Sequence, residues 1–250
     1  VILIKGLALI AEVRSFRSFW FSVLMFALLA FFCWGWFFCD DRRDPLESMN
    51  RSIFDFNEAV DQTVLKPVAT VYRDVTPSWV RKGVTNFFNN LEDVWSVVNN
   101  ALQLRGQDTG DSIARVMVNT TVGLLGFVDV ASDLNVERHT ASFGLTLGRW
   151  GVQPGPYLVL PLLGPSTLRE LAALPVDWQG RPLNAVDDTA TRNGLTATNL
   201  LNVRATYLGA GDIVDGAALD KYSFMREAYL QRRRSQVYDG DPPEEEVDAP

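Results

Sequence analysis

Apolar residues recur every three or four positions through most of the chain after residue 43, which is the spacing of amphipathic helices. The segment "DPLE" predicts the start of the first of these helices, with Asp44 as N-cap, Pro45 as first helical residue and Glu47 completing a capping box. The helix that follows carries one apolar stripe, made by Ile53, Phe56, Val60 and Val64. Asn57 borders that stripe.

A second long helix is predicted after "TPSW", where Thr76 and Pro77 repeat the pattern of a helix start. One of its faces is apolar and consists of Phe87, Leu91, Val94, Val98 and Leu102. The remaining positions hold Asn86, Asn89, Asn90, Asn99 and Asn100. Asparagine is a poor helix former, so this concentration indicates a face that needs neutral hydrogen bonding in place of charge.

The segment "VMVNTTVGLLGFV", residues 116–128, has no charged residue and contains Gly123 and Gly126. It is too short to cross a bilayer, and each glycine weakens an exposed helix by about 1 kcal/mol relative to alanine. The pattern favours a short helix that packs closely against another helix or bends. The alternative interpretation is a buried central helix of a globular core.

The stretch "GPYLVLPLLGPS", residues 155–166, combines core-type side chains with three prolines and two glycines. The prolines and glycines exclude a helix or a central strand, so an irregular apolar loop is expected. Ser166 or Thr167 with Glu170 predicts the start of the next helix. Further helices are predicted within 185–207 and 219–234. We find no alternating strand pattern of any length, and the predicted fold class is therefore all-α.

Residues 18–39 form an uncharged apolar run, preceded by Arg14 and Arg17 and followed by "DDRRD". This arrangement is typical of export or membrane insertion, and it leaves three alternatives: a cleaved signal, an uncleaved span, or a lipoprotein signal acylated at Cys33 or Cys39. Neither cysteine has the small preceding residue that lipidation favours, although Cys33 is better placed. The expected organisation is a signal or anchor at 1–39, a helical domain at 40–236 and a disordered acidic tail at 237–250.

Composition excludes several classes of chemistry. With one histidine and two cysteines, both in the apolar run, neither a metal site nor a cysteine nucleophile is expected. His139 and Ser142 are three residues apart, but no acid is positioned to complete a catalytic set. No phosphate-binding loop is present to hold a nucleotide. The net charge of −7 and the single basic run "QRRRS", interpreted as the solvated end of a helix, argue against a nucleic-acid partner. We therefore predict no enzyme activity and no cofactor.

Longer motifs resemble one family, MlaA, also called VacJ. "DPLESMNRSIFDFN" is similar to the opening D-P-x-E-x-x-N-R-x-x-F-x-F-N of that family. Further signatures follow in the same order over residues 44 to about 240: "KPVATVYRDVTP", "NFFNNLED", "RVMVNTTVGLLGFVDVAS", "FGLTLGRWGVQPGPYLVLPLLGPSTLRE" and "REAYLQRR". The sequence departs from the family at the poor lipidation site and at Ser142, where an acidic residue usually precedes the Phe-Gly pair.

The resemblance implies a phospholipid-binding lipoprotein on the periplasmic side of the outer membrane of a Gram-negative bacterium. It implies a helical ring embedded in the membrane beside a trimeric porin, with an amphipathic channel through the ring. Such a protein takes mislocalised phospholipid from the outer leaflet and passes it to a soluble periplasmic carrier, which maintains lipid asymmetry. An apolar loop rich in glycine and proline is tolerable there, because it faces acyl chains or packs inside the ring.

On this basis we expect the lipid path to include Phe56, Asn57, Asn119, Gly123, Leu124, Gly126, Tyr157, Leu158, Leu160 and Leu162. Two other functions remain as alternatives. One is a structural protein that only contacts a porin, and the other is an envelope lipid hydrolase.

Overall fold

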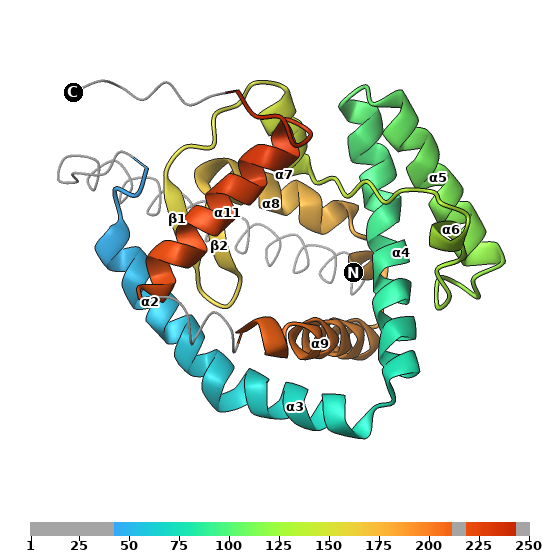
Figure 1. Ribbon diagram of the computed structural model, residues 1–250, viewed down its shortest axis with the longest axis horizontal. Helices are drawn as coiled ribbons and strands as arrows, with labels where there is room; N and C mark the ends of the chain where they lie inside the picture. The colour runs from blue at the N-terminus through green and yellow to red at the C-terminus, as the bar shows by residue number, and fades with distance from the viewer. Residues whose placement is uncertain (1–42, 212–218, 244–250) are drawn as a thin grey trace, which may run out of the picture. The chain divides into compact units, whose positions relative to one another are not determined.

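The computed structural model describes residues 43–211 and 219–243 and divides the chain into two compact units, Val1–Glu47 and Ser48–Pro250. Helices account for most of the described residues (Figure 1). In chain order the elements are α2 (Glu47–Val60), η1 (Asp61–Leu65), α3 (Lys66–Val75), α4 (Ser78–Leu102), α5 (Gly106–Thr121), α6 (Val130–Asp133), α7 (Phe143–Arg149), β1 (Tyr157–Leu160), β2 (Gly164–Thr167), α8 (Leu168–Gly180), η2 (Pro182–Ala185), α9 (Thr189–Thr206) and α11 (Lys221–Val237). Among these residues, no helix combines the length and apolar character needed to cross a membrane.

The prediction of a fold without strands is wrong at one place. Strands β1 and β2 form a two-stranded antiparallel hairpin in which Tyr157 lies opposite Thr167 and Leu160 lies opposite Gly164. The prolines are accommodated because Pro161 lies in the turn and Pro165 lies in a strand at the edge of a two-stranded sheet. The segment expected to be an irregular loop is thus a short hairpin.

Several helix ends differ from the predicted ones. Helix α2 begins at Glu47, two residues after Pro45, and the Glu47 amide donates to the Asp44 carbonyl at 3.3 Å. At α4 the N-cap is Pro77, while Thr76 is extended with ψ of 122°. Both differences are within the usual uncertainty of helix boundaries, because terminal turns fray and their assignment varies.

The short glycine-bearing helix is a larger correction. Helix α5 ends at Thr121, so Gly123, Leu124 and Gly126 lie in the following turn. Leu124 and Leu125 have φ of 53° and 60°, and Gly126 has φ of 94°. The bend that the glycines suggested is present in this turn. The close packing is present as well, because a Cβ on Gly126 would lie 2.6 Å from the Cβ of Asn90 in α4.

The later helices agree with their predicted starts. Thr167 caps α8 and accepts a hydrogen bond from the Glu170 amide at 3.4 Å. Asp188 caps α9 and Asp220 caps α11 in the same way. Helix α11 continues to Val237, which is buried and therefore belongs to the helical unit instead of the predicted tail.

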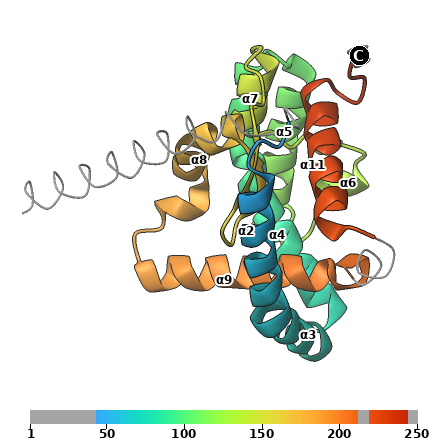
Figure 2. The same cartoon turned by 90° about the vertical axis from the view of Figure 1, so that its left-hand side faces the viewer.

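Contacts between elements of the second unit form a closed circuit. Helix α3 packs on α9, α9 on α4, α4 on α7, α7 on α11, and α11 on β2. Strand β1 pairs with β2 and is hydrogen-bonded to α2, which leads through η1 back to α3. Figure 2 shows α9 crossing α3 steeply. Helix α5 lies outside this circuit and packs along α4 (Figure 1).

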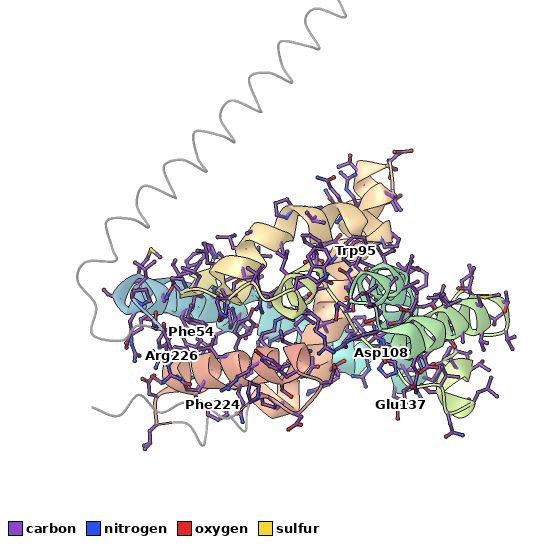
Figure 3. All side chains as sticks on the ribbon, turned by 90° about the horizontal axis from the view of Figure 1, so that it is seen from above. Phe54, Trp95, Asp108, Glu137, Phe224 and Arg226 are labelled. Carbon is purple, nitrogen blue, oxygen red and sulfur yellow. The ribbon has the colours of Figure 1, made fainter. Side chains whose placement is uncertain are left out.

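A small aromatic cluster joins α2, the hairpin and α11. Tyr157 and Tyr222 are buried, with ring centroids 6.2 Å apart, and Phe54 meets the Tyr222 ring edge-on at 5.7 Å. Arg51 lies over the Tyr222 ring at 4.4 Å and adds a cation–π contact. In Figure 3, Phe54 and Arg226 lie close together where α2 meets α11. This cluster closes the circuit on the hairpin side.

The distribution of polarity is the reverse of that in a soluble globular protein. Among the described residues, the fully buried set contains more polar and charged side chains than apolar ones, including Asn50, Asp93, Asn99 and Arg115. Helix α4 buries Asn90, Asn99 and Asn100, whereas Val94, Val98 and Leu102 of its apolar face are about two-fifths exposed, at 39%, 42% and 40%. The apolar stripe of α2 behaves similarly, since Phe56 is exposed by 52%.

Other predictions fall outside the described residues. The apolar run 18–39, with Cys33 and Cys39, lies before residue 43, and residues 244–250, the second half of the predicted acidic tail, lie beyond residue 243. The signal or anchor, the mode of lipid attachment and the tail therefore stay predictions.

Candidate functional site

A cavity of about 470 Å³ lies between α4, α9, α11 and the segments around α7 and α8. Helix α4 contributes one face, spaced every three or four residues: Thr85, Phe88, Asn89, Glu92, Trp95 and Ser96. Helix α9 contributes a matching face: Asn199, Asn202, Val203, Thr206 and Tyr207. The two faces mix amide, hydroxyl and aromatic groups, so the cavity is amphipathic.

Asn202 holds the two walls at a fixed separation. It is 2% exposed, and its amide donates to the Thr85 hydroxyl of α4 at 2.7 Å. Its amide oxygen accepts from the Tyr72 hydroxyl of α3 at 3.0 Å. Burial raises the pKa of Tyr72, opposed by the nearby Arg81 charge, so this phenol stays a neutral donor at physiological pH. One amide thus links three helices.

The opposite wall is fixed through the carboxylate of Asp177 in α8. One of its oxygens accepts from the Trp95 indole and from the Phe143 amide, each at 2.7 Å. Figure 3 shows Trp95 next to α8. The approach is close, because a Cβ on Gly180 would lie 2.4 Å from the Trp95 ring. Helices α4, α7 and α8 are therefore held together at this wall.

Four arginines line the cavity, and two of them have carboxylate partners. Arg138 donates to Asp93 at 2.7 Å and also lies 3.6 Å from Glu92. Arg233 lies 3.2 Å from Glu170. Burial alone would lower the pKa of Arg233, but the Glu170 carboxylate outweighs that effect and raises it. The side chains of the other two, Arg181 and Arg232, have neither a hydrogen bond nor an ion pair to residues 43–211 or 219–243.

A second cavity, of about 660 Å³, is lined by Arg105 together with the carboxylates of Asp108 and Asp239. Arg105 pairs with Asp108 at 3.3 Å and with Asp239, and His139 lies 3.3 Å from Asp111. The Ser142 hydroxyl instead accepts from the Leu145 amide as the N-cap of α7. The structure therefore does not bring His139 and Ser142 together as a hydrogen-bonded pair. Among the described residues, no group of histidine, cysteine and acidic side chains has the geometry to hold a metal ion.

Two asparagines of α2 hold the hairpin by pairing with its backbone. Asn50 donates to the Tyr157 carbonyl at 3.1 Å and accepts from the Val159 amide at 2.9 Å. Asn57 donates to the Leu160 carbonyl at 3.0 Å and accepts from the Leu162 amide at 2.8 Å. Each amide thus replaces the hydrogen bonds of a third strand along the free edge of β1. This pairing explains why a short two-stranded hairpin is stable here.

Comparison with known proteins identifies the family to which this chain belongs. The family model described as "MlaA lipoprotein" matches residues 42–236. The chain belongs to the MlaA lipoprotein family. The match covers every element from α2 to the last turn of α11.

Named relatives agree with this assignment. The Escherichia coli K12 protein "Intermembrane phospholipid transport system lipoprotein MlaA" is 34% identical over 202 residues, which is 76% of this chain and 77% of that protein. An uncharacterised protein of Rickettsia felis is 33% identical over 200 residues, 80% of each chain. A solved structure from work on the structural basis for maintenance of bacterial outer membrane lipid asymmetry has a TM-score of 0.70 at 34% identity, covering 78% of this chain and all of that chain.

The lipid-path residues predicted from the MlaA resemblance fall into three groups. Tyr157, Leu158 and Asn119 are buried, and Asn119 binds the Asp129 carboxylate and the Ala131 amide. Phe56, Leu124 and Leu162 are exposed by 52%, 70% and 68%. The remaining residues shape the backbone or border it: Asn57 at the hairpin, Gly123 and Gly126 in the turn after α5, and the half-buried Leu160.

None of these ten residues lines the 470 Å³ cavity. That cavity is built by residues that the sequence interpretation did not select, above all Asp177, Asn202 and the arginines. A signal was available in part, since Asn199, Asn202, Val203 and Thr206 repeat at helical spacing on α9. Without the crossing of α9 over α3 and α4, however, nothing in that spacing says which face is enclosed.

Proposed function

We propose that this protein moves intact phospholipid at the outer membrane of a Gram-negative bacterium and so maintains lipid asymmetry. Three relatives are named as lipoproteins of an intermembrane phospholipid transport system. At 34% identity over most of the chain, the E. coli relative makes a shared function the first expectation.

The single observation that carries the proposal is the reversed distribution of polarity. In water, apolar surface is driven inward and large exposed apolar patches are rare. Among the described residues more buried side chains are polar or charged than apolar, while large apolar side chains are exposed on α3, α4 and α5, including Val71, Val98 and Met117. Such a surface is stable where it contacts hydrocarbon, and polar groups inside then provide a path for a headgroup.

Four exposed leucines strengthen this argument. Leu104, Leu124, Leu125 and Leu162 all have positive φ, between 53° and 63°, and exposures from 64% to 92%. The left-handed backbone costs an L-residue about 1–2 kcal/mol, and glycine or asparagine usually takes such positions. Because these leucines gain little packing within the described residues, their contact with acyl chains is the gain that favours them.

The circuit of helices supports a ring, with the amphipathic cavity as part of a channel through it. Exposing a lipid chain to water costs about 0.8 kcal/mol per methylene. A path with apolar and polar walls lowers that barrier without breaking a bond, so no catalytic residue is required. The direction of transport then depends on the protein that accepts the lipid.

The location and partners follow from the family. We infer a position on the periplasmic side of the outer membrane, attachment through lipid on Cys33 or Cys39 or through an uncleaved apolar segment, a trimeric porin as neighbour and a soluble periplasmic carrier as acceptor. The poor lipidation site leaves open which form of attachment applies.

The decisive test is complementation. This protein is expressed in a Gram-negative strain from which the strain's own MlaA protein has been deleted. Outer-leaflet phosphatidylethanolamine, labelled with a membrane-impermeant amine reagent, should return to the level of the parent strain. Mass spectrometry of the detergent-purified protein should detect intact phospholipid. A protein that restores porin assembly but leaves surface phospholipid high is structural, and release of free fatty acid by the purified protein indicates a hydrolase. Either result contradicts the proposal.

A further inference from the structure

The arginines of the 470 Å³ cavity are not accounted for by the fold. Arg138 contacts Asp93 and ties the segment before α7 to α4, and Arg233 contacts Glu170 and ties α11 to α8. Arg181 and Arg232 contribute no such link within residues 43–211 and 219–243. Both are exposed and both line the cavity, so their positive charges face open space instead of a protein partner.

Their positions on two different elements make a chance arrangement of surface charge a poor explanation. Arg181 is the residue that ends α8 and precedes η2. Arg232 lies in the last turns of α11, within the basic run that the sequence suggested to be only the solvated end of a helix. The fold brings these two distant positions to the wall of one cavity. Carboxylates on the same wall are engaged: Glu92 lies near Arg138, and Asp177 accepts hydrogen bonds from Trp95 and Phe143.

A guanidinium without a protein partner is a strong ligand for phosphate oxygens, because its planar set of donors matches a phosphate in two parallel hydrogen bonds. Three other lining residues offer carbon surface to a ligand. Leu145 and Val203 line the cavity with Tyr207, which is 59% exposed. A ligand that carries a phosphate next to hydrocarbon satisfies both kinds of wall, whereas free phosphate satisfies only the arginines.

We propose that Arg181 and Arg232 form a binding site for the phosphate group of a phospholipid headgroup, with Leu145, Val203 and Tyr207 contacting the carbon atoms next to it. The cavity is within the range of about 300–1,000 Å³ that is usual for small-molecule sites, so it accommodates a headgroup and the adjoining part of the lipid. This proposal rests on the proposed function and deepens it. It gives the transport path a specific stopping point for the charged end of the lipid.

The test is direct binding to the full-length protein in a nonionic detergent. Isothermal titration calorimetry with dihexanoyl-phosphatidylglycerol measures the phosphodiester with short chains, dihexanoylglycerol lacks the phosphate, and inorganic phosphate lacks the hydrocarbon. The double variant Arg181→Gln/Arg232→Gln should bind the phospholipid at least about tenfold more weakly, since it loses charge-assisted hydrogen bonds to the phosphate. The variant Arg73→Gln, on the exposed side of α3, is the matched control and should bind as the wild type does.

The double lysine variant Arg181→Lys/Arg232→Lys separates charge from geometry. It should retain part of the affinity, because lysine supplies the charge but not the paired donors. Neither arginine side chain pairs with another described residue, so both double variants should unfold at the same temperature as the wild type. A thermal melt checks this.

Three results would overturn the inference: equal affinity of the wild type and the double glutamine variant for the phospholipid, equal affinity of the wild type for dihexanoylglycerol, or tight binding of inorganic phosphate with none of the phospholipid. These results are distinguishable from a failure of the proposed function. If the double variant binds as the wild type does and still lowers surface phosphatidylethanolamine in cells, only the headgroup site is wrong. If wild-type protein does not lower surface phosphatidylethanolamine, the transport function is wrong.

Discussion

Asn50 and Asn57 hold the hairpin to α2 at two points seven residues apart. Replacing Asn50 by leucine removes the hydrogen bonds to the Tyr157 carbonyl and the Val159 amide, both in buried residues, at about 1–3 kcal/mol for each bond. We expect Asn57→Leu to cost less, about 0.5–1.5 kcal/mol, because the Leu162 amide is exposed and water replaces the lost partner. Urea unfolding in detergent measures both changes.

Asn86→Leu is the control for these two variants. Asn86 makes one exposed hydrogen bond, to the Phe127 carbonyl at 3.2 Å, so its loss should change the free energy of unfolding least. An Asn50→Leu variant as stable as Asn86→Leu would show that the hairpin does not depend on the α2 amide.

Asp129 makes the stability of the α5–α6 region depend on pH. Desolvation alone would raise its pKa, but hydrogen bonds from Ser132, Asn119 and Arg115 outweigh this and lower it below 3.8. A carboxyl group with a lowered folded pKa stabilises the protein above its unfolded pKa, and this contribution is lost as the pH falls through the folded value.

We therefore expect the stability of the wild type to fall as the pH drops below the pKa of an ordinary aspartate. The stability of Asp129→Asn should depend less on pH in that range. Thermal unfolding measured from pH 6 down to pH 2 checks this, with Asp74→Asn, on the exposed side of α3, as control. Identical pH profiles for Asp129→Asn and wild type would contradict the assignment.

At the scale of elements, α4 shows its apolar face outside and its asparagine face inside. Asn99 is buried and accepts from the Thr146 hydroxyl at 2.9 Å, which ties α4 to α7. We expect Asn99→Leu to lower the free energy of unfolding by about 1–3 kcal/mol, since it leaves buried polar groups unpaired. Val98→Asn, one position away on the exposed face, should change stability in detergent by less than about 0.5 kcal/mol. The opposite order would mean that α4 has a conventional apolar core side.

The turn between α5 and α6 gives a second prediction at this scale. Leu124 is exposed by 70%, so Leu124→Arg should leave the thermal stability in detergent unchanged. If the turn contacts hydrocarbon, the charge costs about 2.5–3.5 kcal/mol at depth. Flotation of the protein with liposomes should then decrease relative to Leu124→Ala. Unchanged flotation would place the turn outside the hydrocarbon.

At the scale of the whole molecule, the proposed lipid path is tested at two positions, one on the exposed hairpin turn and one in the cavity. A photo-crosslinking residue at Leu162, on the hairpin turn, should capture phospholipid, since that side chain is exposed by 68%. A photo-crosslinking residue in place of Tyr207, which lines the cavity, should capture phospholipid only when the lipid enters that cavity. Mass spectrometry of the adducts reads both positions. Protein adducts alone at both sites would contradict a lipid path through this unit.

The sequence by itself determined the helical character, several helix starts and the family. The start of α8 at Thr167 was predicted because a side-chain oxygen next to a free amide caps a helix locally. The glycines after Thr121 marked a bend and a close approach for the same reason, since a backbone without Cβ is a local property. Motifs spread over most of the chain identified the family without any three-dimensional information.

Only the tertiary structure decided which face of each helix is enclosed. The spacing of Val94, Val98 and Leu102 is the same whether that face meets a core or a membrane, so periodicity alone does not decide between the two. The hairpin was missed because its stability comes from Asn50 and Asn57 in a helix about 100 residues earlier, not from its own strand pattern. The cavity depends on the crossing of α9 with α3 and α4, and Arg181 and Arg232 both line it only because packing brings the end of α8 and the last turns of α11 to the same cavity. Long-range packing of this kind leaves no signature in the local sequence, since each of these residues fits its own helix equally well whatever the helix packs against.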